Sequence, residues 1–307
     1  MFPDPSSVSR FFRGVYQRFG LTIRGIREAT GVLWPRMQLT RLWGGQSSWR
    51  PDTAEEFVPF VANLTGTSTT EVWDHLWRRR TGHPVLSQLE ACVFWPPSEK
   101  SMQELGRRAI QALSSGATWV HVGGELPLWM VPDDSRRRAV RSLLAALDVG
   151  DHAAATHWEG YCAKLFDHLF PADADALRTI PGTVLIAQAG LAGLMAGRPP
   201  WDALDDWDLG DFIDGVARAM PERGGKFGIL ADPGGDPGSS PLGTLQDVDS
   251  LWIIGNRLLI RRDRGSAVWA SCERTGNPLD DVFLDGQIAL VDGLKPLARF
   301  RLPERFE

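Results

Sequence analysis

The stretch "GLTIRGIREATGV", residues 20–32, predicts a tight turn followed by a short helix near the start of the chain. Gly20 is suited to end a preceding helix, and Thr22 is suited to cap the helix that starts after it. Apolar residues then recur at helical spacing until Gly31, where the pattern stops. The stretch therefore has the start signal, the apolar side and the stop signal of a short helix.

Helical periodicity continues on both sides of this stretch. The segment SVSRFFRGVYQRF, residues 7–19, carries its apolar residues on one helical stripe. Pro35 is suited to the first turn of a third helix, and residues 47–66 and 67–79 predict a fourth and a fifth. Two short helices joined by a glycine-containing turn make a helix-turn-helix. We therefore expect an all-α domain of five short helices at residues 1–80.

The first fifty residues are basic although the whole chain is acidic. The 307 residues have a net charge of −5, whereas residues 1–50 hold eight arginines against two acidic residues, Asp4 and Glu28, a local balance of +6. A basic segment on an acidic chain is the pattern expected when one domain binds a polyanion. The charge distribution therefore favours double-stranded DNA as a partner.

Composition excludes several classes of protein. A hydrophobic fraction of 43% fits compact globular domains. The chain has no apolar run long enough to cross a membrane and no secretory signal at its start, so we expect no membrane partner and a cytoplasmic location. Cys92, Cys162 and Cys272 are far apart and outside any CxxC spacing, which favours buried free thiols over a disulfide framework or a zinc knuckle.

Residues 7–78 resemble the phage-repressor (Cro/CI or XRE) DNA-binding domain. That family has a glycine, then a serine or threonine two residues on, an aliphatic residue six on, and Gly-Val at eleven and twelve. The residues at these offsets are Gly20, Thr22, Ile26, Gly31 and Val32. The chain departs from the family where Arg27 replaces an alanine and where Trp34-Pro35 lengthen the turn. Both departures affect how the third helix would dock.

The resemblance implies that the third helix lies in the major groove of DNA. The side chains that would then read base edges are Arg36, Met37, Gln38 and Thr40. Those that would contact phosphates are Thr22, Arg24, Arg41 and Arg50. The resemblance also implies a homodimer on a two-fold related operator, and hence a sequence-specific transcriptional regulator. The alternative is a non-catalytic effector or adaptor, for example in phage defence, whose helical head binds a protein.

The chain changes character after residue 80. His83-Pro84 and Pro96-Pro97 interrupt the helical periodicity, which predicts a linker at residues 81–99. Helical and strand-like segments then alternate, so we expect an α/β or α+β domain at residues 100–307 that senses a ligand or dimerises. The expected helices are residues 100–115, 133–148 and 157–170, and the expected strands are residues 117–124, 182–190 and 226–232. The dipeptides Gly255-Asn256 and Asp285-Gly286 predict two β-hairpins.

The order of these segments resembles phospholipase-D-type domains attached to bacterial regulators. Active members of that family carry His-x-Lys, because the imidazole attacks phosphorus and the lysine holds the phosphate oxygens. None of the six histidines is followed two residues later by lysine. Phosphate-binding glycine motifs and helical metal-binding histidine pairs are also lacking. We therefore expect no enzymatic activity, no cofactor and no metal.

The chain holds thirteen tryptophans but two tyrosines. Several of the tryptophans fall near predicted strand ends or loops, where an aromatic ring can line a small-molecule pocket. The residues proposed for this pocket are Trp119, His121, Trp129 and Trp158. The alternative is that these tryptophans are ordinary core residues. A small-molecule or protein effector is accordingly expected on the C-terminal domain.

Overall fold

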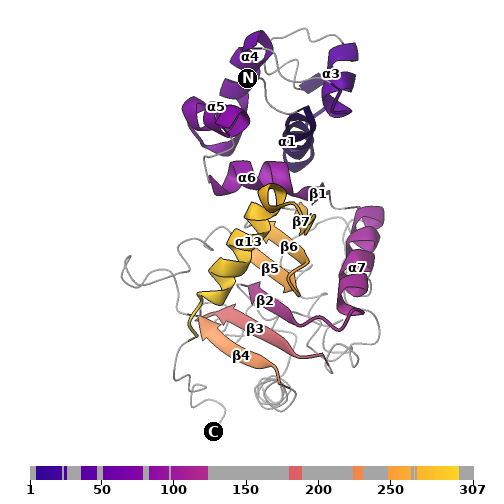
Figure 1. The fold of residues 1–307 in the computed structure, drawn as a ribbon, viewed down its shortest axis with the longest axis vertical. Helices are drawn as coiled ribbons and strands as arrows, with labels where there is room; N and C mark the ends of the chain where they lie inside the picture. Colours follow the sequence, from indigo (N-terminus) through magenta and orange to yellow (C-terminus); the bar gives the residue numbers. More distant parts are fainter. Residues whose placement is uncertain are drawn as a thin grey trace, which may run out of the picture. The chain divides into compact units, whose positions relative to one another are not determined.

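The computed structural model places most of the expected helices and strands (Figure 1). It describes residues 5–22, 24–25, 36–46, 51–78, 83–96, 98–123, 180–188, 224–230, 248–263, 266 and 268–296. The described chain falls into two compact units. Unit 1 comprises Met1–Pro96 and Ala270–Gly286, and unit 2 comprises Pro97–Trp269 and Gln287–Glu307.

Unit 1 contains most of the helices. Its helices are α1 (Pro5–Arg18), α3 (Arg36–Trp43), α4 (Pro51–Thr65), α5 (Thr69–Arg78), α6 (Pro84–Ala91) and the first part of α13 (Pro278–Asp292). Two strands belong to the same unit, β1 (Val93–Trp95) and nearly all of β7 (Trp269–Glu273). Helix α6 and strand β1 lie in the segment expected as a linker.

Unit 2 contains one described helix before its central strands, α7 (Glu99–Leu113). The strands are β2 (Trp119–Gly123), β3 (Gly182–Ala187), β4 (Lys226–Leu230), β5 (Val248–Ile254) and β6 (Leu258–Asp263). Strand β3 pairs in parallel with β2 and β4, whereas β5 pairs antiparallel with β2 and β6. Over the described residues, seven strands form one mixed sheet in the order β1-β7-β6-β5-β2-β3-β4.

The expected fold class, an all-α N-terminal domain followed by a separate α/β domain, is wrong. Strands β1 and β7 and the start of α13 belong to the same unit as the N-terminal helices. Within that unit, Trp95 Nε1 donates a hydrogen bond to Ser271 Oγ at 2.8 Å, and Phe94 of β1 is buried. Strand β1 is three residues long and its partner lies far along the chain, so no local pattern marks it. The larger α/β body that was expected is present.

The hairpin predicted at Asp285-Gly286 is also wrong, because both residues lie inside α13. Asp280 and Asp281 lie in the first turn of this helix, where negative charge is favourable. Leu284 and Val291 are buried at a spacing of seven residues, which is a helical repeat and not the alternation of a strand. Asp285 and Gly286 therefore adopt the helical conformation of their neighbours and do not form a turn.

The other hairpin is confirmed. Strands β5 and β6 pair antiparallel, with Ile254 opposite Leu258, and Gly255 has a φ of 59° at the turn. The first, third, fourth and fifth helices, the helix at 100–115 and the strands expected around β2, β3 and β4 are confirmed as well. Most of the second helix and the helices expected at 133–148 and 157–170 lie outside the described residues.

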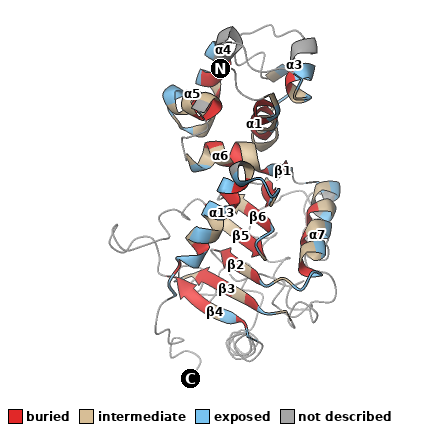
Figure 2. Ribbon diagram, in the orientation of Figure 1, coloured by how far each residue is buried: buried red, intermediate tan, exposed pale blue. Residues whose placement is uncertain are grey.

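Each unit has its own core, as the burial colouring shows (Figure 2). In unit 1, the apolar stripe of α1 is buried, and the rings of Phe12 and Phe57 lie 5.7 Å apart. In unit 2, Leu105 and Ala109 of α7 are buried, and this helix contacts β5. The amphipathic patterns of α1 and α7 therefore predicted which sides of these helices are buried.

Cys92 and Cys272 are buried free thiols, as expected, and Cys162 lies outside the described residues. A hydrogen bond from the Cys92 side chain lowers the pKa of the Cys272 thiol, although burial and nearby acidic groups act in the opposite direction.

Candidate functional site

Helix α3 is held against α1 by both polar and aromatic contacts. Ser9 Oγ donates a hydrogen bond to the carbonyl oxygen of Trp43 at 2.7 Å, and Arg13 Nε donates to the same oxygen at 2.9 Å. The Trp43 ring packs edge-to-face on Tyr16, with ring centres 4.9 Å apart. Leu42 is buried. The end of α3 is thus fixed on α1 through the Leu42–Trp43 side.

The described residues that were expected to contact DNA lie at the surface. Thr40 and Arg41, next to buried Leu42, are exposed on α3. Thr22 and Arg24 are exposed as well. The side chains of Arg36, Met37 and Gln38, and all of Arg50, lie outside the described residues.

The start of the second helix has the cap that the sequence predicts. Gly20 has a φ of 59°, and the chain then enters a helical conformation at Arg24 and Gly25. Thr22 Oγ1 accepts a hydrogen bond from the Gly25 amide at 2.9 Å, which is the N-cap arrangement. The capping role predicted for Thr22 is therefore confirmed.

Among the described N-terminal arginines, Arg10, Arg13 and Arg18 make contacts inside unit 1. Arg10 forms an ion pair with Asp280, and Arg13 packs over the Trp43 ring with its guanidinium 5.5 Å from the ring centre. Arg18 donates a hydrogen bond to Gln88 Oε1 and packs over Phe94. The acidic partners of Arg10 offset its charge, so the local balance of +6 overstates the positive charge available to bind a polyanion.

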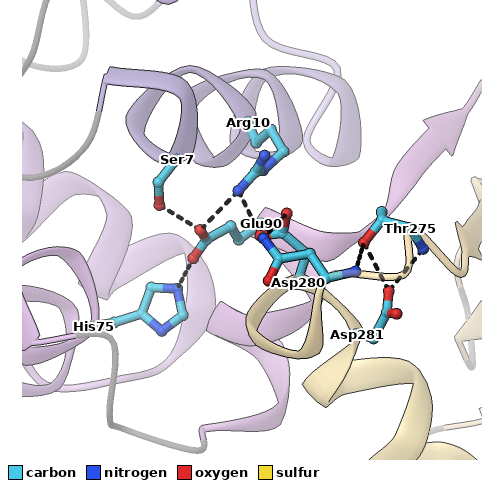
Figure 3. Close-up of polar contacts among 8 residues, drawn as sticks. Ser7, Arg10, His75, Glu90, Thr275, Asp280 and Asp281 are labelled. Atoms are coloured by element: carbon cyan, nitrogen blue, oxygen red, sulfur yellow. Dashed lines mark hydrogen bonds and ion pairs between the residues drawn. The ribbon is translucent and has the colours of Figure 1, made fainter.

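A polar cluster that no sequence motif marks is centred on Glu90 of α6 (Figure 3). Glu90 Oε1 accepts a hydrogen bond from Ser7 Oγ and lies 3.7 Å from Arg10 Nη2. Glu90 Oε2 lies 3.1 Å from His75 Nε2. His75 is buried, and its ring centre lies 5.4 Å from that of Phe11. The Glu90 carboxylate of α6 thus contacts side chains from α1 and α5.

The cluster extends to the start of α13. Arg10 Nη2 donates a hydrogen bond to Asp280 Oδ1 at 2.9 Å (Figure 3). The adjacent Asp281 is buried and accepts hydrogen bonds from the Thr275 amide at 2.8 Å, Thr275 Oγ1 at 3.0 Å and the Gly276 amide at 3.0 Å. The bond from the Thr275 amide is the main reason that the pKa of Asp281 lies below its usual value. Asp281 therefore fixes the loop before α13 as a carboxylate.

A cavity of about 160 Å³ adjoins this cluster. Its charged and polar lining comes from α1, α5, α6, β7 and the segment around Asp280, and the rest of the lining is apolar. The lining includes Arg10, Glu90, Glu273, Asp280, Val282 and Phe283. No sequence signal marks this cavity, because Arg10 and Asp280 are 270 residues apart in the chain.

The pocket proposed around the tryptophans is described only in part. Trp119 and His121 of β2 are both 3% exposed, and both contact Trp252 of β5 with ring centres 5.7 Å and 4.3 Å apart. Trp119 and His121 therefore fit the alternative to a small-molecule pocket, which is that they are ordinary core residues. Trp129 and Trp158 lie outside the described residues.

Within the described part of the chain, no group of histidine, cysteine, aspartate or glutamate residues is arranged to hold a metal ion. The helices of the same part include none that is long and apolar enough to span a membrane. Comparison of the chain with protein-family models, curated proteins and solved structures finds no significant match. Function must therefore be argued from the residues themselves.

Proposed function

We propose that this protein is a sequence-specific DNA-binding transcriptional regulator whose N-terminal helices contact double-stranded DNA. The observation that carries the proposal is the packing of α3. Leu42 and Trp43 hold this helix on α1, while the neighbouring Thr40 and Arg41 stay exposed. A helix fixed by one side, with polar and basic residues on another, is suited to enter a DNA groove.

The capped turn after α1 supports the same proposal. Thr22 caps the helix start directly after a glycine of positive φ, as the resemblance to phage-repressor domains implies. A helix N-terminus with exposed Thr22 and Arg24 is also suited to hold a phosphate. The DNA-binding segment is proposed as part of unit 1, which includes β1, β7 and the start of α13, and not as a separate all-helical domain.

Selection from random-sequence duplex DNA tests the proposal, with sequencing of the retained fraction at two salt concentrations. The full chain is expected to enrich a two-fold related motif, because the family implies a homodimer on paired half-sites. An Arg36→Ala/Gln38→Ala variant is expected to lose the motif but to keep salt-sensitive nonspecific binding. An Arg41→Ala variant is expected to keep the motif, bind every sequence more weakly and lower the salt slope by about 1.

A matched control comes from α7. Arg107 and Gln111 are exposed on this helix, so Arg107→Ala/Gln111→Ala removes the same two side-chain types away from the proposed reading helix. This control should select the same motif as the unmodified protein. Failure of the unmodified protein to retain DNA at low salt would contradict the proposal and favour a protein partner for the helical head. Sedimentation of the protein as a monomer on the selected site would contradict the homodimer.

A further inference from the structure

The cavity beside Glu90 lies wholly within unit 1 and is lined by both charged and apolar side chains. Its volume of about 160 Å³ is close to that of an engineered protein cavity of about 150 Å³ that binds benzene. The cavity is therefore large enough for a ligand built around one small ring or a short branched chain.

The charge of the lining selects one class of ligand. Three carboxylates, Glu90, Glu273 and Asp280, face the cavity together with a single guanidinium, that of Arg10. Even with His75 protonated, the charged lining is net negative. An anionic ligand would be repelled, whereas a cation would gain charge-assisted hydrogen bonds to carboxylate oxygens.

The protein's own contacts show which cationic group these carboxylates accept. Asp280 Oδ1 binds the Arg10 guanidinium at 2.9 Å, and Glu90 Oε1 lies 3.7 Å from the same nitrogen. The Arg10 side chain is 41% exposed, so its ion pairs are accessible to solvent. A flat nitrogen cation is thus already accommodated in the wall, and Glu273 brings a further carboxylate.

Part of the lining is apolar. Ala91, Val282 and Phe283 line the cavity, and Val282 is 62% exposed. A ligand with a hydrocarbon body would cover this exposed surface and gain free energy from its burial.

We propose that the cavity lined by Glu90, Glu273, Asp280, Val282 and Phe283 binds a small organic cation, namely an amidinium, guanidinium or primary amine attached to a compact apolar body. The cationic group lies between the Glu273 and Asp280 carboxylates, and the apolar body lies against Val282 and Phe283. This site goes beyond the proposed DNA-binding function and does not depend on it, because the binding involves no DNA.

Three ligands of nearly the same shape and different charge test the proposal. Benzamidine is a cation, benzamide is neutral and benzoate is an anion. Isothermal titration calorimetry of the full chain without DNA is expected to show benzamidine binding about tenfold more tightly than benzamide, since one charge-assisted hydrogen bond is worth about that factor. Benzoate is expected to show no binding.

Two matched variants test whether the ligand binds in this cavity. Glu273→Gln keeps the size of an exposed side chain and removes one carboxylate of the cavity, so it is expected to weaken benzamidine about tenfold and to leave benzamide unchanged. Glu55→Gln makes the same chemical change at an exposed position of α4 that does not line this cavity, and it is expected to leave both affinities unchanged. Circular dichroism of each variant verifies its fold.

The opposite results are equally clear. Equal affinities for benzamidine and benzamide would show that charge does not select the ligand. Benzamidine binding that persists unchanged in Glu273→Gln would show that the cation binds elsewhere. Either result, or no benzamidine binding at millimolar concentration, overturns the proposal.

Discussion

Two close packing contacts, one in each unit, both depend on glycine but differ in what opposes it. In unit 1, a Cβ atom added to Gly14 of α1 would overlap the backbone carbonyl oxygen of Leu89 in α6. In unit 2, a Cβ atom added to Gly182 of β3 would overlap the indole ring of Trp119 in β2. The helix crossing is therefore limited by the main chain, whereas the strand contact is limited by one side chain.

Because the obstacle is main chain at Gly14 and a side chain at Gly182, we expect the two sites to tolerate an added methyl group differently. A backbone carbonyl moves only if its whole helix moves, and Leu89 is fully buried. An indole ring can turn about its side-chain torsions, at the cost of an unfavourable rotamer. The Trp119 ring covers a glycine directly across the strand pair, an arrangement in which an aromatic residue fills the space that the glycine leaves.

The largest effect is expected for Gly14→Ala. Alanine is the better helix former by about 1 kcal/mol, yet the added methyl forces α1 away from α6. We expect the free energy of unfolding to fall by more than about 3 kcal/mol. Urea denaturation measures it, with Gln17→Ala on the same helix as a control within about 0.5 kcal/mol of the unmodified protein. Unchanged stability of Gly14→Ala would show that the two helices separate without cost.

A smaller effect is expected for Gly182→Ala, about 1–3 kcal/mol, because the opposing group is a side chain. The same measurement in a Trp119→Leu background sharpens the comparison. Removing the indole ring should relieve the clash, so Gly182→Ala should cost less there than in the unmodified protein. A cost that is the same in both backgrounds would mean that the ring is not the obstacle.

The smallest effect is expected for Gly20→Ala, which separates backbone conformation from crowding. Gly20 has a φ of 59° but no heavy atom within 4 Å of an added Cβ. The expected cost is therefore that of the left-handed conformation alone, about 1 kcal/mol. Asparagine visits this conformation more readily, so Gly20→Asn should cost less than Gly20→Ala. Equal losses for the two variants would point to a cause other than φ.

Local patterns predicted local structure well. The stripe of α1, the cap at Thr22 and the turn at Gly255 each involve residues within a few positions of one another. Such signals depend on periodicity and on the conformational preferences of single residues, both of which one sequence displays.

Long-range structure was not predictable in the same way. The pairing that brings β7 into the unit of the N-terminal helices leaves no periodic signal, and the fold class was wrong for that reason. The cluster of Ser7, His75, Glu90 and Asp280 combines single polar residues from four segments. In the sequence, none of these residues differs from an ordinary surface residue. The hairpin predicted at Asp285-Gly286 is wrong because the turn preference of two residues is weaker than the helical context of α13.

Unit 1 is built from two segments that are far apart in the sequence, and this affects the order in which its parts are synthesised. This unit includes residues 270–286, which a ribosome adds only after the whole of Pro97–Trp269 has been synthesised. Arg10 and the β1 edge therefore lack their Asp280 and Ser271 partners while the intervening segment emerges. A gene fragment that stops after residue 96 would encode the proposed DNA-reading helices without the segment that completes their unit.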